Sequence, residues 1–130
     1  MNYQTLYEQM GGAETVRRLV EAFYPRVQVD PDIGPLFPPD ITPVMEKQYL
    51  FLTQFFGGPA LYNEKHGHPM LRMRHMPFPI NARRAAAWLR CMTAALDEIG
   101  LSGTVRDEVY QRLAFTAGHM INTDDEERQP

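Results

Sequence analysis

Hydrophobic residues recur along most of this chain at steps of three and four, the spacing typical of amphipathic helices. A short helix is expected over residues 6–10, closed by Gly11-Gly12. A longer apolar stripe follows over residues 16–27, with Pro25 inside it, where we expect a kink or a lost hydrogen bond. No segment alternates apolar and polar positions over the length of a strand, so the pattern predicts an all-α protein.

The middle of the chain is broken by proline and glycine. Residues 30–41 contain four prolines and a glycine, which favours a compact turn with short 3₁₀ pieces. Thr42 is expected to cap the next helix, with Pro43 at its first position. Residues 59–69 are expected to form a loop, followed by about two turns of helix ending near His75. The inward positions of the capped helix are predicted to be Val44, Gln48, Phe51 and Phe55.

Two longer helices complete the pattern. Asn81 is expected to cap the first, and the second follows residues 100–103 and ends near Ile121. We therefore expect one domain over residues 1–130, with 122–130 as a frayed polar tail. The predicted inward stripes of these helices are Ala85, Trp88, Met92, Ala95 and Ile99, and Val105, Val109, Leu113, Thr116 and Met120.

Composition limits the classes of function. The chain has 130 residues, 44% of them hydrophobic, and a formal net charge of −3, which provides no basic field for nucleic acid. Its single cysteine, Cys91, excludes an internal disulfide and fits a reducing compartment. No signal peptide is visible and no apolar run reaches the roughly 20 residues that cross a bilayer. A soluble, cytoplasmic protein without a membrane partner is expected.

The histidines give the first candidate for chemistry. His66, His68 and His75 offer three nitrogens for zinc, but their spacing is irregular and no carboxylate lies at helical distance. His75 alone suits a haem, because an imidazole among apolar side chains and guanidinium groups can ligate iron. The alternative is a structural histidine beside surface arginines. The neighbours that would grip the porphyrin or meet its propionates are Leu71, Arg72, Arg74, Phe78 and Ile80.

Three further residues carry hydrogen-bond donors on predicted inward stripes. Tyr24, Gln48 and Trp88 belong to three different helices. Buried donors need partners, and backbone carbonyls could satisfy each one separately. If all three converge, they indicate one shared acceptor, such as a small ligand held on iron.

At this point the chain resembles the group II truncated haemoglobins over nearly all of residues 3–122. The resemblance rests on the glycine pairs 11–12 and 57–58, and on FYPRV (23–27), FLTQFFGGPALY (51–62) and HGHPMLRMRHMPFPI (66–80). It also rests on Trp88 within RAAAWLRCM. It implies an all-α, two-over-two helical sandwich around haem b.

The resemblance also implies roles for individual residues. His75 would be the proximal iron ligand, and Tyr24, Trp88 and Gln48 would stabilise a ligand on the distal side. Val44 would occupy the distal position where animal globins carry histidine, and it can neither donate a hydrogen bond nor ligate iron. The residues expected to contact haem are Phe37, Val44, Lys47, Tyr62, Leu71, Arg72, Arg74, His75, Phe78 and Ile80.

The function implied is reversible binding of oxygen and other diatomic ligands at a five-coordinate haem iron, for oxygen transport or storage. The alternative is a haem enzyme with peroxidase-like or nitric oxide dioxygenase activity that uses an external reductase. A third reading, a helical sensor without haem, conflicts with the presence of His75 and all three donors. The expected assembly is a monomer or a homodimer.

Overall fold

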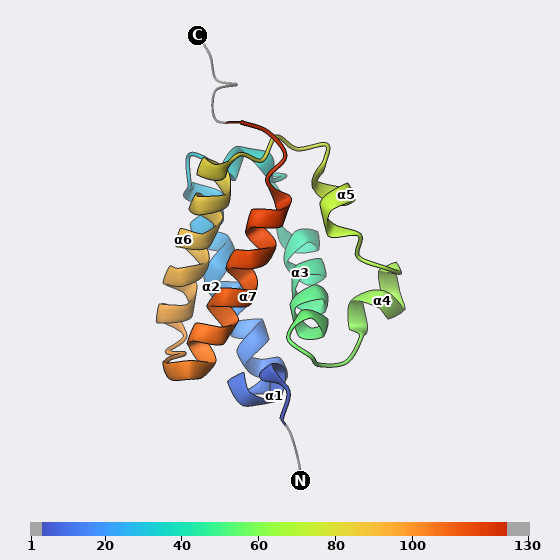
Figure 1. The fold of residues 1–130 in the computed structure, drawn as a ribbon, viewed down its shortest axis with the longest axis vertical. Coiled ribbons are helices and arrows are strands. Elements are labelled where there is room, and N and C mark those ends of the chain that lie inside the picture. The colour runs from blue at the N-terminus through green and yellow to red at the C-terminus, as the bar shows by residue number, and fades with distance from the viewer. Residues whose placement is uncertain (1–3, 125–130) are drawn as a thin grey trace.

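The computed structural model describes residues 4–124 and is helical throughout, with no strand in that range. The all-α prediction is therefore confirmed. Figure 1 shows α2, α6 and α7 packed together, with α3, α4 and α5 to one side of them. The elements are α1 (Leu6–Met10), α2 (Gly12–Val29), the 3₁₀ turn η1 (Gly34–Leu36), α3 (Thr42–Phe55), α4 (Leu61–His66), α5 (Leu71–His75), α6 (Ala82–Glu98) and α7 (Gly103–Met120).

The predicted boundaries of the first short helix, α1, are confirmed. Thr5 caps α1 in a capping box, in which the Glu8 N–H donates to the Thr5 hydroxyl and the Thr5 N–H donates to the Glu8 carboxylate. Gly11 ends α1 at a φ of 117°, a left-handed conformation that a side chain would strain. The short α1 is thereby fixed against α2 and α7.

Helix α2 is the centre of the core, because it packs against both α3 and α6. Its apolar stripe is buried, and the helix continues through Pro25 to Val29 without a break. Pro25 is exposed, so the carbonyl that its missing N–H leaves free can be hydrated at the surface. The buried residues of α2 are Val16, Leu19, Val20, Ala22, Phe23, Tyr24 and Val27.

Two predictions about the middle of the chain are corrected. Ile41 occupies the cap position of α3, so Thr42 is its first helical residue and Pro43 lies within the first turn. The expected loop over residues 59–69 contains α4, a helix of six residues. Such a short helix shows no readable periodicity. It is fastened by the Gln54 amide, which accepts from the Asn63 N–H at 2.9 Å and donates to the Asn63 side chain at 3.0 Å.

Helices α5, α6 and α7 complete the fold. Asn81 caps α6 as predicted, accepting the Arg84 N–H at 2.8 Å, and α6 packs against both α2 and α7. The short α5 packs against α7 and stands apart from α6 (Figure 1). Within residues 4–124, no helix has the length and apolar character needed to cross a membrane.

The chain end departs from the prediction of a tail frayed from residue 122. Asn122 and Thr123 both donate their backbone N–H groups to the Ile80 carbonyl, at 2.8 and 3.2 Å. Residues 125–130 of the predicted tail lie outside the described residues. The polar composition gave no sign of this contact, because its partner lies over forty residues earlier in the chain.

Candidate functional site

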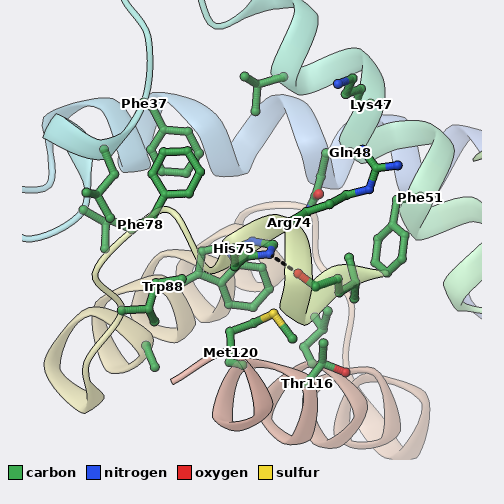
Figure 2. Close-up of a pocket in the computed structure, with 18 of the residues that line it drawn as sticks. Phe37, Lys47, Gln48, Phe51, Arg74, His75, Phe78, Trp88, Thr116 and Met120 are labelled. Atoms are coloured by element: carbon green, nitrogen blue, oxygen red, sulfur yellow. Dashed lines mark hydrogen bonds between the residues drawn. The ribbon is translucent and has the colours of Figure 1, made fainter. Parts of the chain in front are cut away.

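A cavity of about 310 Å³ lies among α2, α3, α5, α6 and α7, within the range of roughly 300–1,000 Å³ typical of small-molecule sites. Figure 2 shows Gln48 entering from α3 on one side and Thr116 and Met120 from α7 on the other, with His75 between them. The lining residues are Tyr24, Ile33, Leu36, Phe37, Val44, Lys47, Gln48, Phe51, Leu52, Phe55, Tyr62, Leu71, Arg74, His75, Phe78, Ile80, Arg84, Ala85, Trp88, Leu113, Thr116, Ala117 and Met120.

His75 is the last residue of α5 and is half-buried at the cavity wall. Its Nδ1 lies 2.7 Å from the Leu71 carbonyl oxygen, one turn back in the same helix (Figure 2). A carbonyl oxygen can only accept, so Nδ1 carries a proton, and in the neutral ring the lone pair is therefore on Nε2. The ring is thus held in the tautomer and orientation in which Nε2 is available to a metal ion.

The three predicted donors do converge on this cavity. Tyr24 comes from α2, Gln48 from α3 and Trp88 from α6, and all three line it. Within residues 4–124, their side-chain donors make no hydrogen bond. Tyr24 is only 3% exposed, and burial raises the pKa of its hydroxyl well above the ordinary value, so the group stays protonated and able to donate.

An aromatic cluster fixes two of these donors. The Phe23 ring packs edge-on against Tyr24 at a centroid distance of 4.8 Å and against Trp88 at 5.4 Å. Phe37, from the segment after η1, packs edge-on against Tyr24 at 6.1 Å. Because Phe23 is fully buried, it couples the Tyr24 and Trp88 rings through the core.

Cationic side chains lie at the edge of the cavity. Lys47 and Arg74 line it together and appear at the same edge in Figure 2. Desolvation lowers the pKa of His66, and the positive charges of Lys47, Lys65 and Arg74 lower it further. The Arg74 Nε donates to the Pro69 carbonyl at 2.6 Å, which orders the base of the side chain. This edge therefore suits an anionic group.

The structure corrects one predicted site residue. Arg72 does not line the cavity. Its guanidinium donates to the carbonyls of His119 and Ile121, at 3.1 and 3.2 Å, and so faces the end of α7. Arg72 and Arg74 are two positions apart in a helix, so they lie on different faces. Arg74 can therefore face the cavity while Arg72 faces away from it. The twelve other predicted site residues all line the cavity.

Several lining residues were not predicted as part of the site. Arg84 lines the cavity while donating to the carbonyls of Pro79 and Asp32, at 2.7 and 3.2 Å. Thr116 and Met120 were expected to point inward, but helical periodicity does not say which inward residues face a cavity and which fill the core. The other unpredicted lining residues are Ile33, Leu36, Phe51, Leu52, Phe55, Ala85, Leu113 and Ala117.

The zinc alternative finds no support among the described residues, where no three histidine, cysteine or acidic side chains are grouped to hold a metal. His66 packs on the Tyr62 ring at 5.0 Å. His68 is exposed and does not line the cavity. His119, on α7, packs on Phe115 at 4.8 Å.

Comparisons with known proteins agree with this geometry. The bacterial-like globin family matches residues 5–122 of the chain. The group 2 truncated hemoglobin YjbI of Bacillus subtilis is 50% identical over 128 residues, which cover 98% of this chain and 96% of that protein.

Solved structures extend the likeness to the fold. The crystal structure of the group II truncated hemoglobin of Bacillus anthracis superimposes with a TM-score of 0.95 at 49% identity, covering 98% of each chain. The truncated oxygen-avid haemoglobin of Bacillus subtilis gives a TM-score of 0.89 at 51% identity, covering 92% of this chain and 100% of that one. The predicted two-over-two helical arrangement is confirmed by these matches.

Proposed function

This chain belongs to the bacterial-like globin family as a group II truncated haemoglobin, and we propose that its primary function is the reversible binding of dioxygen at haem b. Membership of the family implies a haem cofactor and binding of small diatomic ligands. The observation that carries the proposal is the convergence of one orientated imidazole and three donors on one cavity, those of Tyr24, Gln48 and Trp88.

The residues present fit a haem. The walls of the cavity are mainly aliphatic and aromatic, as a porphyrin requires, and Phe37 and Phe78 come from two different segments. The hydrogen bond from His75 Nδ1 to the Leu71 carbonyl leaves Nε2 of the neutral ring as the nitrogen suited to iron. Lys47 and Arg74 supply positive charge at one edge, where propionates would be paired. The chain therefore offers an apolar cavity, a candidate iron ligand and positive charge at one edge, which together support the proposal.

When bound, ferrous haem would supply the reversible binding of a diatomic ligand. The residues of this chain then decide how long the ligand stays. Tyr24, Trp88 and Gln48 are placed to donate hydrogen bonds to it, and Val44 leaves the adjacent position apolar. Because Val44 has no nitrogen or oxygen in its side chain, it cannot occupy the ligand's place on the metal.

The strength of this stabilisation follows from ordinary hydrogen-bond energies. A neutral hydrogen bond contributes about 1 kcal/mol net, and two or three of them slow ligand release by tens to hundreds of times. Burial of Tyr24 keeps water away from its hydroxyl, which strengthens the effect of that donor. We therefore propose tight oxygen binding with slow release.

Contacts to the haem edge are assigned to Arg74 and Lys47, with Tyr62 nearby. Tyr62 is buried and packs edge-on against Phe51 at 5.9 Å, so its ring is held at the cavity wall. Arg84, which lines the cavity with its guanidinium already bonded to two carbonyls, joins this set as a partly satisfied cation. Arg72 is not assigned a contact to haem, because its guanidinium donates to the carbonyls of His119 and Ile121 at the end of α7.

One feature favours ligand binding over a peroxidase-like function. Among the described residues that line the cavity there is no carboxylate, and His75 is the single histidine. Cleavage of an O–O bond is accelerated by a side chain that takes and returns a proton, and a neutral tyrosine with a raised pKa does this poorly. Continued turnover would in addition need an external reductase.

Absorption spectra of the purified chain test the proposal. We expect a Soret band, a five-coordinate ferrous spectrum and a stable spectrum under oxygen that reverts on deoxygenation. Steady-state turnover with peroxide or nitric oxide, compared with free haem, separates binding from catalysis. A chain that shows no Soret band after reconstitution with haem, or an oxygenated form that decays within seconds, contradicts the proposal.

A further inference from the structure

The helix that carries His75 cannot hold its own position. Helix α5 has five residues, none of them buried, and isolated helices of this length are unstable in water. Met70, the residue before its first turn, has a φ of 48°, an unfavourable conformation for a residue with a side chain. The position of α5 must therefore be imposed by contacts from outside, and α7 is the helix against which it packs.

Those contacts come from the end of α7 and the residues after it. The Asn122 side-chain amide donates to the carbonyls of His75 and Phe78, at 3.3 and 2.9 Å. Its oxygen accepts the Ile80 N–H at 3.0 Å, and its backbone N–H donates to the Ile80 carbonyl at 2.8 Å. One asparagine thus bonds the main chain at three positions in the six residues from His75 to Ile80.

Arg72 holds the same helix from a second point. Its Nε and Nη2 donate to the carbonyls of His119 and Ile121, which lie in the last turn of α7 and just beyond it. Figure 1 shows this end of α7 running beside the segment that leads from α5 to α6. The hydrogen bonds of Arg72, before His75, and of Asn122, to His75 and the residues after it, together fix the orientation of α5 and its distance from α7.

We propose that Asn122 and Arg72 form a clasp that sets the position of the His75 imidazole, and that both are positioning residues of the haem site. The naming of His75 as iron ligand rests on the proposed function, whereas the hydrogen bonds of the clasp do not. Since the imidazole is tied to Leu71 within α5, any movement of α5 moves Nε2 with it. The clasp would therefore set the geometry of the iron–histidine bond, although neither Asn122 nor Arg72 lines the cavity.

The chemistry of the amide explains why asparagine suits this position. It offers two donor hydrogens and an acceptor oxygen at short reach, and here both functions are used. Aspartate keeps the acceptor for the Ile80 N–H but cannot donate to the two carbonyls. Alanine loses all three bonds. Both variants are therefore expected to disturb α5 relative to the unchanged chain, Asn122→Ala by losing three bonds and Asn122→Asp by turning an acceptor oxygen towards two carbonyls.

Hydrogen exchange of the full chain tests the clasp independently of haem. In Asn122→Ala and Arg72→Ala we expect the amides of Arg74, Met76 and Phe78 to exchange at least about tenfold faster, with α2 and α6 unaffected. Arg112→Ala is the matched control, because it removes an exposed ion pair with Glu108 on the same helix, α7. Faster exchange spread evenly over all helices would reduce Asn122 to a general structural role and overturn the proposal.

Resonance Raman spectroscopy of the ferrous holoprotein provides the second measurement. The iron–histidine stretching band is expected to shift and broaden in Asn122→Ala and in Asn122→Asp, and not in Arg112→Ala. In the two Asn122 variants, haem loss to an acceptor globin is expected to be several-fold faster. If Asn122→Ala does not fold, Asn122→Asp carries the test. An unchanged band together with unchanged exchange refutes the clasp. A chain that takes up no haem but shows the localised exchange refutes the proposed function and leaves the clasp supported.

Discussion

Replacing Trp88 by phenylalanine isolates one hydrogen bond at the site. The substitution keeps a ring to pack against Phe23, whose centroid lies 5.4 Å from that of the indole, and removes the Nε1–H. Because this donor makes no hydrogen bond within residues 4–124, its removal breaks no hydrogen bond in the described part of the protein. A net loss of about 0.5–1.5 kcal/mol corresponds to an oxygen off-rate faster by about 2- to 13-fold, with the on-rate within about twofold.

Stopped-flow mixing of the oxygenated protein with carbon monoxide measures this off-rate. Tyr24→Phe completes a double-mutant cycle, since it keeps the ring contacts to Phe23 and Phe37 and removes only the hydroxyl. Tyr110→Phe is the control, because that tyrosine lies outside the cavity. Carbon monoxide accepts hydrogen bonds weakly, so its own off-rate should change less. An oxygen off-rate in Trp88→Phe within twofold of the unchanged chain would refute the assignment of the indole.

Three other changes have expected outcomes. His75→Gly should lose haem on gel filtration and regain a Soret band when imidazole is added, whereas a retained haem would mean another ligand. Pro25→Ala should raise the free energy of unfolding by about 1 kcal/mol in urea titrations, because an exposed helical position regains its N–H donor. Burial raises the pKa of Tyr24 above its ordinary value near 10. Above that pH the unfolded chain loses the proton first, so the free energy of unfolding should fall by up to ~1.4 kcal/mol per pH unit, and by less in Tyr24→Phe.

The sequence predicted the helices that have long apolar stripes and the residues that carry the site. His75 was found because its segment is bounded by prolines and flanked by apolar and cationic residues. Tyr24, Gln48 and Trp88 were found because each places a donor on an inward stripe. Their convergence on a single cavity needed the fold, since they lie on three helices far apart along the chain.

What the sequence missed depends on contacts between distant segments. Helix α4 has too few residues to show a period, and it is fastened through Gln54. Arg72 and Arg74 look alike in the sequence, yet only Arg74 faces the cavity, because α7 takes the donors of Arg72. Asn122 belonged to a segment predicted to fray, and its partners lie over forty residues earlier.

Because α5 is attached on one side only, its attachment affects how well the protein resists degradation in the cell. The wall of the cavity that carries His75 is joined to the body through the end of α7, so a bound cofactor would add the contacts that hold it from within. Anything that binds only the folded chain stabilises it by mass action, and the open segment around α5 is where a protease would cut first. The supply of haem would then set how much of this protein survives as well as how much of it works.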